Sequence, residues 1–430
     1  MRRRERLSRI RYLRGEEVLD SRGNPTVAAT CELVGGHIAR VSIPSGASTS
    51  PIEAVELRDG DALRYRGLGC RKAAANVSGP ISDAVSGRDL DQQSLDTLLI
   101  ELDGTERKSR LGANALLSAS LSFALATAHE VGVAPYVSFA QLAGEVPTRL
   151  PRPAINLFSG GLHAGKQVPI QDVLVLMPSA RTIDDILAMT SDVYRAAVEL
   201  VHRKYGARHL VADEGGLAPS FPNADVMLED AVEAIAAAGL RSGTDAVLCI
   251  DVASTQFYEN GRYRFGAELL EPDAMIDKVV RWVRDFPIVS VEDALAHDDW
   301  DHWAAFRSRV AGQAVVLADD LVATNPSRIQ KAADLLAADA LLLKLNQIGT
   351  VSEALQALKA ARSSHWLVTV SARSGDTEDS WLADLGVGWG ADNLKVGSLS
   401  RSERISKWNR LLSIERSSQL PVAEWPVTHS

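Results

Sequence analysis

Six short apolar runs in the second half of the chain, each ending in polar residues, constrain the fold more than any other feature. They are AVLCID, IVSVED, VVLADD, ALLLKLN, LVTVSARS and NLKVGS, with polar ends at Asp251, Glu292, Asp319, Lys344, Ser371 and Lys395. The steps between these ends are 41, 27, 25, 27 and 24 residues. A strand, a crossover helix and two loops need about that length, so the spacing predicts a parallel α/β barrel. No G-x-G-x-x-G follows any run, which removes the usual dinucleotide-binding signature.

The residues before the barrel show a different pattern of predicted strands and helices, which indicates a separate, smaller domain. Residues 1–145 mix short strand-like pieces with helices, and a hairpin is expected to turn at Gly35 and Gly36. The Ala- and Ser-rich stretch 113–131 predicts a helix that is apolar around much of its circumference and is buried against another domain. Prolines at 151 and 153 indicate a boundary. We therefore expect an α+β N-terminal domain over 1–145 and a barrel over 146–430.

Charge and cysteine usage exclude several classes of protein. Asp and Glu number 55 against 46 Lys and Arg, and a net charge of −9 argues against general nucleic-acid binding. The basic N-terminal stretch lacks the apolar segment of a signal peptide, and no run of about 18 apolar residues predicts a membrane span. The three cysteines show no paired spacing and fit reduced thiols. These features predict a cytoplasmic protein.

The carboxyl ends of barrel strands converge and carry the active site in such folds. Asp251, Glu292 and Asp319 would therefore share one small volume, where they would repel one another unless a divalent cation lay between them. Ligands that are all oxygen atoms suit Mg²⁺ rather than zinc. A single Asp after a strand is more often a turn residue or helix cap, which is the role expected of Asp293 and Asp320. Repetition at successive strand ends favours a metal site.

Lys344 interrupts an otherwise apolar run directly after these acids. Desolvation and a neighbouring cation would both lower the pKa of this lysine, which makes it a candidate general base. The next strands supply Arg373 with Ser374, and then Lys395, which are groups suited to phosphate and carboxylate oxygens. The pattern therefore predicts metal-assisted proton abstraction from an anionic substrate.

Seven motifs resemble the enolase (phosphopyruvate hydratase) family. They are VLDSRGNPTV, PSGASTS, VADEGGLAP, VEDALAHDDW, ADALLLKLNQIGT, SARSGDTEDS and KVGSLSRSER, and they run in the family's order from about residue 10 to 415. The resemblance implies a small α+β domain and a C-terminal enolase-type (β/α)8-like barrel whose first two strands are antiparallel. It also implies Mg²⁺-dependent elimination of water from 2-phosphoglycerate, or a close analogue, in a homodimer or higher homo-oligomer.

The resemblance assigns a role to each matching residue. It implies that Asp251, Glu292 and Asp319 bind the first Mg²⁺, that Lys344 removes the proton α to a carboxylate, and that Glu214 protonates the departing C3 hydroxyl. A second Mg²⁺ would arrive with the substrate. The remaining implied ligands are Ser48 for that second ion, Arg373 and Ser374 for the phosphate, and Lys395, Gln171 and His163 for the rest of the substrate.

Four positions depart from the family pattern. Asp172, at a substrate-binding position, stands where enolase has the Glu that partners the catalytic acid, and Ala372 stands where enolase has His. Ser159 replaces Asn and Ser50 replaces Gly. The substitutions lie where the hydroxyl leaves and where loops close on the substrate. Shortening Glu to Asp withdraws the carboxylate by roughly one methylene, which matters at hydrogen-bond distance.

Three alternatives follow from these departures. The chain is a true enolase, or it is a paralogue that accepts a bulkier substrate near the phosphate. A relative of the second kind is carboxyphosphonoenolpyruvate synthase of phosphonate natural-product biosynthesis. The third alternative is a non-catalytic binding or scaffold protein, and it ranks last. Clustered acids and a buried lysine without metal chemistry would destabilise the fold.

Overall fold

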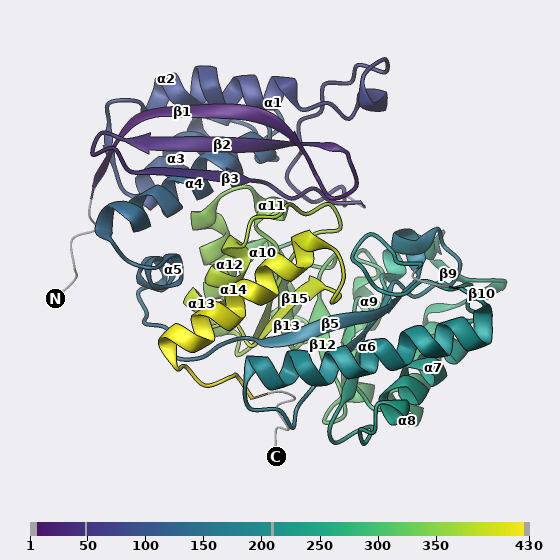
Figure 1. Ribbon diagram of the computed structural model, residues 1–430. Coiled ribbons are helices and arrows are strands. Elements are labelled where there is room, and N and C mark those ends of the chain that lie inside the picture. Colours follow the sequence, from purple (N-terminus) through teal and green to yellow (C-terminus); the bar gives the residue numbers. More distant parts are fainter. Residues whose placement is uncertain (1–6, 48–49, 208–209, 425–430) are drawn as a thin grey trace.

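The computed structural model describes residues 7–47, 50–207 and 210–424, which form a smaller N-terminal domain packed on a barrel (Figure 1). The N-terminal domain is built on an antiparallel sheet in the order β3-β2-β1-β4. Its strands are β1 (Ser8–Leu19), β2 (Pro25–Leu33), β3 (Ile38–Ser42) and β4 (Asp89–Leu90). Its helices are α1 (Arg71–Asn76), α2 (Ser82–Val85), α3 (Gln92–Asp103), α4 (Ala113–Val131) and α5 (Pro135–Ala143).

The predicted hairpin is confirmed. Strands β2 and β3 pair antiparallel from Ala28 opposite Ser42 to Glu32 opposite Ile38. The turn contains Gly35 and Gly36, and Gly36 has a φ of +84°, a left-handed conformation that costs glycine little.

Helix α4 fills the interface between the two domains. The predicted limits, 113–131, are those of the observed helix. Leu116, Ala119 and Phe123 belong to the hydrophobic cluster of the N-terminal sheet, whereas Leu117 and Leu121 belong to the cluster of the barrel. The prediction that this helix is buried against another domain is therefore confirmed.

Eight strands close the barrel in the order β11-β12-β13-β14-β15-β5-β6-β7. They are β5 (Arg152–Ser159), β6 (Asp172–Leu176), β7 (Val247–Asp251), β11 (Ile288–Glu292), β12 (Val315–Ala318), β13 (Ala340–Leu343), β14 (Leu367–Ser371) and β15 (Asn393–Gly397). The six predicted runs are β7 and β11 to β15, and these pair in parallel. Strand β6 is antiparallel to both β5 and β7, so the expected antiparallel start of the barrel is confirmed.

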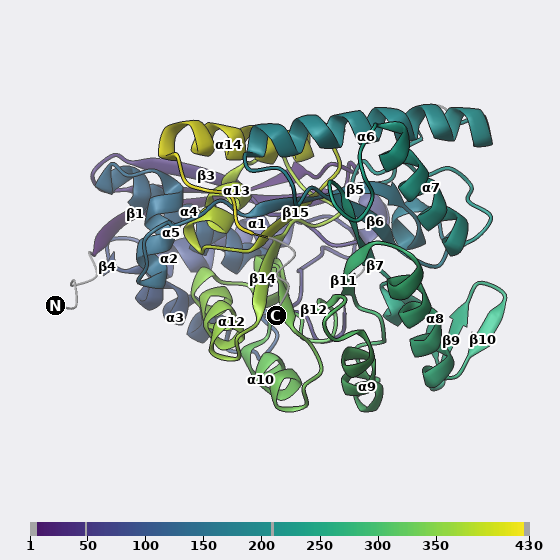
Figure 2. The same cartoon turned by 90° about the horizontal axis from the view of Figure 1, so that it is seen from below.

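Helices surround the strands, as Figure 2 shows for α8, α9, α10 and α12. The barrel-domain helices are α6 (Ile183–Tyr205), α7 (Ala224–Ala237), α8 (Pro272–Asp285), α9 (Trp300–Val310), α10 (Pro326–Asp334), α11 (Leu345–Ile348), α12 (Val351–Ser363), α13 (Trp381–Gly388) and α14 (Ser402–Ser418). A three-stranded sheet of β8 (Tyr258–Glu259), β9 (Arg262–Phe265) and β10 (Glu268–Leu270) lies outside the barrel. The boundary at 145/146 stays a prediction.

Among the described residues, no single helix has the length and apolar character needed to cross a membrane. Helices α4 and α5 meet such a criterion only as a pair, and they are bent by 108° relative to each other. Most of α4 is buried inside the protein, so its apolar character is explained by the domain interface.

Candidate active site

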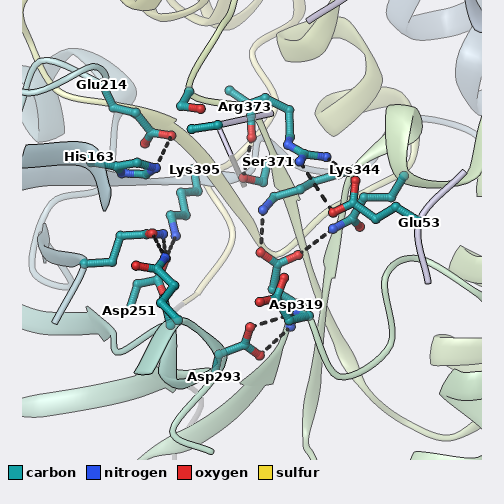
Figure 3. A pocket seen from close by; sticks show the side chains of 18 residues that line it. Glu53, His163, Glu214, Asp251, Asp293, Asp319, Lys344, Ser371, Arg373 and Lys395 are labelled. Atoms are coloured by element: carbon teal, nitrogen blue, oxygen red, sulfur yellow. Dashed lines mark hydrogen bonds and ion pairs between the residues drawn. The ribbon is translucent and has the colours of Figure 1, made fainter. Parts of the chain in front are cut away.

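A polar cavity opens at the carboxyl ends of the barrel strands (Figure 3). Most predicted site residues line it, namely His163, Gln171, Glu214, Asp251, Asp319, Lys344, Arg373, Ser374 and Lys395. Asp172 and Glu292 are not among the lining residues, but each contacts a residue that is. The remaining prediction, Ser48, lies outside the described residues. The loop before Ala54 contributes Ala47 and Glu53, so the N-terminal domain forms one wall of the cavity.

Lys344 lies directly after the fully buried strand β13 and is held by its neighbours. Its backbone N–H donates to the Thr324 Oγ1 at 3.0 Å, and its Nζ donates to Asp319 Oδ2. The other oxygen of Asp319 accepts from Gln347 Nε2 at 2.8 Å. Thr324 also donates to Gln347 Oε1 at 2.6 Å, so the base and its carboxylate partner share one hydrogen-bonded network.

Burial and neighbouring charges act in opposite directions on the pKa of Lys344. Burial is the largest influence and lowers this pKa, but the carboxylates of Asp319 and Glu292 together leave it raised above its usual value. The predicted lowering assumes a cation beside the amine, and it stays a prediction for the metal-bound site. Lys344 can become a neutral base only when the charge of Asp319 is balanced by another cation.

Lys395 lies between two of the predicted metal ligands. Its Nζ donates to Asp251 Oδ2 at 2.9 Å and to Glu292 Oε2 at 2.7 Å. Gln171 Nε2 donates to the same Asp251 oxygen at 3.0 Å. Burial lowers the pKa of Lys395, but these carboxylates raise it well above its usual value, so the side chain is a fixed cation.

One carboxylate oxygen of this cluster, Oε1 of Glu292, lacks a hydrogen-bond donor. Glu292 Oε1 is buried without a hydrogen-bond partner. Burial, and then Asp251, raise the pKa of Glu292 well above its usual range. A buried carboxylate oxygen with no donor, beside further acids, fits a hard divalent cation. Oxygen donors of this kind fit Mg²⁺, which would supply the positive charge that the cluster lacks.

A second group of acids lies in the same cavity. Ligand atoms of Asp293, Asp319 and Asp320 all approach within 4.8 Å of one another. Among the described residues, the groups that meet this distance criterion do not include the predicted set of Asp251, Glu292 and Asp319. A shared ion on that set stays a prediction.

Asp293 fulfils the structural role expected of it, and it also lines the cavity. Its carboxylate accepts the backbone N–H of Asp319 at 3.0 Å and that of Asp320 at 2.8 Å, which joins the ends of β11 and β12. Asp320 lines the cavity as well, and burial followed by the charge of Asp319 raises the pKa of Asp320 to about 7. Asp320 directly follows Asp319 in the sequence, but an Asp after a strand end can be a turn residue as well as a site residue, and the sequence does not distinguish these roles.

A separate cluster surrounds Glu214, the predicted acid. His163 Nδ1 is 3.1 Å from Asp172 Oδ2, and its Nε2 is 4.0 Å from Glu214 Oε1. Asn156 Nδ2 donates to Glu214 Oε2 at 3.1 Å. Figure 3 shows the His163–Glu214 pair and Lys344 on separate sides of the cavity, with Lys395 between them.

Burial and neighbouring charges shift the pKa values of the three groups in this cluster in different directions. Burial raises the pKa of Glu214, but the charges of His163, Arg404 and two lysines together outweigh burial, and the pKa is lowered. Burial raises the pKa of Asp172, and His163 offsets it only in part. Burial lowers the pKa of His163, but the two acids raise it above its usual value. These directions favour a charged Glu214 and a protonated His163.

Arg373 is held by the N-terminal domain. Its Nη1 donates to Glu53 Oε2 at 3.0 Å and to Asn346 Oδ1 at 3.1 Å. Arg22 Nη1 donates to Ser374 Oγ at 3.3 Å. Sequence reasoning missed Glu53, because it follows no barrel strand and its contact with Arg373 exists only after the two domains pack together.

Two of the four departures from the family pattern contact each other. Ser159, at the end of β5, donates its hydroxyl to Asp172 Oδ1 at the start of β6, and both side chains are fully buried. Ala372 lines the catalytic cavity and also a second cavity, whose walls include Trp381, Leu382 and Asn346. Arg373 lines both cavities as well, so the second cavity lies next to the proposed phosphate ligand.

An acid-lined cavity, a lysine at a strand end and a buried arginine at the carboxyl face of an α/β barrel are typical of the active site of a barrel enzyme. The comparisons with known families agree with this class. The enolase N-terminal domain model matches residues 10–138, and the enolase C-terminal TIM barrel domain model matches residues 147–421. The chain therefore belongs to the enolase family, whose members typically use Mg²⁺.

Proposed function

We propose that the protein is a Mg²⁺-dependent lyase that dehydrates 2-phosphoglycerate, or a close 2-phospho-3-hydroxy acid, to an enol phosphate. The observation that carries the proposal is the separation of Lys344, paired with Asp319, from the His163–Glu214 cluster across one cavity (Figure 3). A β-elimination needs a base at one carbon and an acid at the next, and this arrangement provides both.

Each step can be assigned to a side chain of this chain. Lys344, as the neutral amine, takes the proton from C2, and the electron pair of the C–H bond forms the C2–C3 double bond. Because the pKa of Glu214 is lowered, His163 first supplies Glu214 with a proton. The C3–O bond then breaks, and Glu214 gives this proton to the departing hydroxyl, which leaves as water. Solvent afterwards restores the proton of His163 and takes up the proton held by Lys344. Arg373 and Ser374 hold the phosphate, while Lys395 and Gln171 orient the rest of the substrate.

The metal ligands proposed from the sequence are Asp251, Glu292 and Asp319 for the first Mg²⁺, and Ser48 for the second. Bound Mg²⁺ would stabilise the extra negative charge that develops on the substrate carboxylate. The unpartnered Glu292 Oε1 supports a cation on the first of these sets.

The test is turnover of 2-phosphoglycerate by the purified protein, followed by the absorbance of the enol phosphate, with Mg²⁺ and with excess EDTA. We expect turnover with Mg²⁺ and none with EDTA. Full activity in EDTA would contradict the metal requirement. Binding of 2-phosphoglycerate without turnover under any metal condition would favour the non-catalytic alternative.

The cavity beside Ala372 favours a second candidate, carboxyphosphonoenolpyruvate synthase. An alanine where the family has His leaves space next to Arg373, and a substrate with an additional carboxyl group on phosphorus could occupy it. Arg373 and Lys395 are cations suited to that carboxylate. A parallel assay with the carboxyphosphono analogue separates the candidates, because only the second predicts a higher kcat/KM for the analogue than for 2-phosphoglycerate.

The remaining proposals concern the setting of the protein. We propose a small phosphorylated hydroxy acid as its substrate and the cytoplasm as its location.

A further inference from the structure

Arg404, near the start of α14, is a fully buried arginine that binds backbone rather than a single acid. Its Nη1 donates to the carbonyl oxygens of Arg373 at 2.7 Å and Val396 at 3.0 Å. Its Nη2 donates to those of Ser374 at 2.6 Å and Asp213 at 3.4 Å. One guanidinium therefore joins three separate segments of the chain.

Each of these segments carries a residue of the proposed reaction. Arg373 and Ser374 follow β14 and are the proposed phosphate ligands. Val396 is next to Lys395 in β15, and Asp213 is next to Glu214. Because the planar guanidinium has donors in fixed directions, it can hold these three backbones in one relative position.

Gly397 provides the space that Arg404 needs. Its φ is +122°, and a Cβ at this position would lie 2.6 Å from Glu214 O and 2.8 Å from Arg404 Cδ. Ser398, the next residue, donates its N–H to the same Glu214 oxygen at 2.8 Å. The Arg404 side chain, β15 and the Glu214 segment are thus in direct contact.

The charge of Arg404 also acts on Glu214. The charged groups that act on this carboxylate are His163, Arg404, Lys395 and Lys344, which lower its pKa, and Asp172, which is repelled by it. Arg404 is the second largest of the lowering charges, after His163.

We propose that Arg404 is a positioning residue that sets the placement of the phosphate ligands relative to Glu214. The inference rests on the proposed function, because Glu214, Arg373 and Ser374 take their roles from it. Among the described contacts of Arg404 none involves Lys344 or Asp319, so a change at Arg404 is expected to disturb the Glu214 side more than the base.

The experiment compares Arg404→Lys and Arg404→Met with the control Lys407→Met. Lys407 is an equally buried cation one turn along α14, and it binds Thr377 O, Glu403 O and Asp376 but no backbone carbonyl of the three segments. For each folded variant, dehydration of 2-phosphoglycerate and exchange of its α-proton with deuterated solvent are measured, together with the pH profile of kcat/KM.

Both Arg404 variants are expected to lose dehydration by about 10- to 100-fold while keeping α-proton exchange, so the ratio of exchange to dehydration rises. In Arg404→Met the inflection that belongs to Glu214 should also move to higher pH, because a positive charge that favours the carboxylate is gone. Arg404→Lys keeps a cation and should shift the Glu214 inflection of the pH profile by less. Lys407→Met should lose thermal stability without changing the ratio of exchange to dehydration or the inflection in the pH profile of kcat/KM.

Equal losses of exchange and dehydration in the Arg404 variants, with an unmoved pH profile, would overturn the proposal. Failure of both Arg404 variants to fold, when Lys407→Met folds, would also overturn it by assigning Arg404 to stability alone. If the unmodified protein neither exchanges nor dehydrates, the proposed function itself has failed, which is a separate outcome.

Discussion

The amine of Lys344 offers the sharpest test at the scale of single residues. Lys344→Ala should abolish both turnover and exchange of the substrate α-proton, because no other amine contacts Asp319 among the described ion pairs. Lys344→Arg should not restore either, since a guanidinium stays protonated. The measurement is loss of the α-proton signal by NMR in deuterated buffer, with the exposed Lys359→Ala as the control. Retained exchange in Lys344→Ala would assign the base elsewhere.

Asp319 combines two roles, as the partner of Lys344 and as a proposed metal ligand. Asp319→Asn should weaken the apparent affinity for Mg²⁺ by about tenfold or more, because a neutral amide replaces an anionic ligand. The measurement is activity as a function of Mg²⁺ concentration, with the exposed Asp334→Asn as the control. An unchanged Mg²⁺ dependence would remove Asp319 from the ligand set.

The departures from the family pattern allow a reversal experiment. If Ala372 and Asp172 are adaptations to a larger substrate, Ala372→His with Asp172→Glu should raise activity on 2-phosphoglycerate by roughly tenfold. The two changes belong together, because neighbours in one site are rarely additive. Since Ser159 donates to Asp172 in a buried contact, a version with Ser159→Asn should be compared. If the unmodified protein already dehydrates 2-phosphoglycerate with the efficiency of ordinary enolases, the substitutions are neutral changes and not adaptations to a larger substrate.

At the scale of elements, Asp96 joins α3 to the start of α12. Its Oδ2 accepts the Ser352 N–H at 2.8 Å, and Gln92 Nε2 donates to both carboxylate oxygens at 3.1 Å. Burial raises the pKa of Asp96 to about 6, and the hydrogen bonds only partly offset it. The domain junction therefore contains a carboxyl group that takes up a proton on folding.

This group should make stability depend on pH. A folded-state pKa of about 6 lies above the unfolded value, so its stabilising contribution is complete below about pH 4 and is lost as pH rises through 6. The difference amounts to about 3 kcal/mol in the free energy of unfolding. Denaturant unfolding of the protein and of Asp96→Asn across pH 4–7 measures it, with the exposed Asp83→Asn as the control. Parallel curves for the protein and Asp96→Asn would contradict the prediction.

The strand ends of the barrel were predictable because strand, helix and loop lengths fix the spacing at which polar residues return to one face. Asp251, Glu292 and Lys344 lie where that spacing places them, at or directly after the ends of β7, β11 and β13. The pairing of Lys344 with Asp319 was not predictable, because strand spacing does not say which side chain lies nearest to the amine. Glu53 was not predictable either, since its contact with Arg373 is made across the domain interface.

At the scale of the whole molecule, the resemblance to enolases predicts a homodimer. Helix α4, a long apolar helix of the N-terminal domain, is already buried between the N-terminal sheet and the barrel. A dimer must therefore use another surface. Analytical ultracentrifugation at micromolar concentration should give twice the chain mass of 46.2 kDa. A single monomeric species over that range would rule out a stable dimer.

Because the N-terminal domain supplies one wall of the cavity, a newly made chain can form the complete cavity only after both domains have been synthesised. Glu53 and Arg373 are 320 residues apart in the sequence, and the ion pair between them crosses the two domains. At synthesis rates of about 5–20 residues per second, Glu53 leaves the ribosome roughly 15–60 s before its partner exists. The first domain is thus made long before the barrel can close against it. Chains released before the last barrel strands are made lack Arg373 and Lys395 and cannot form the complete cavity.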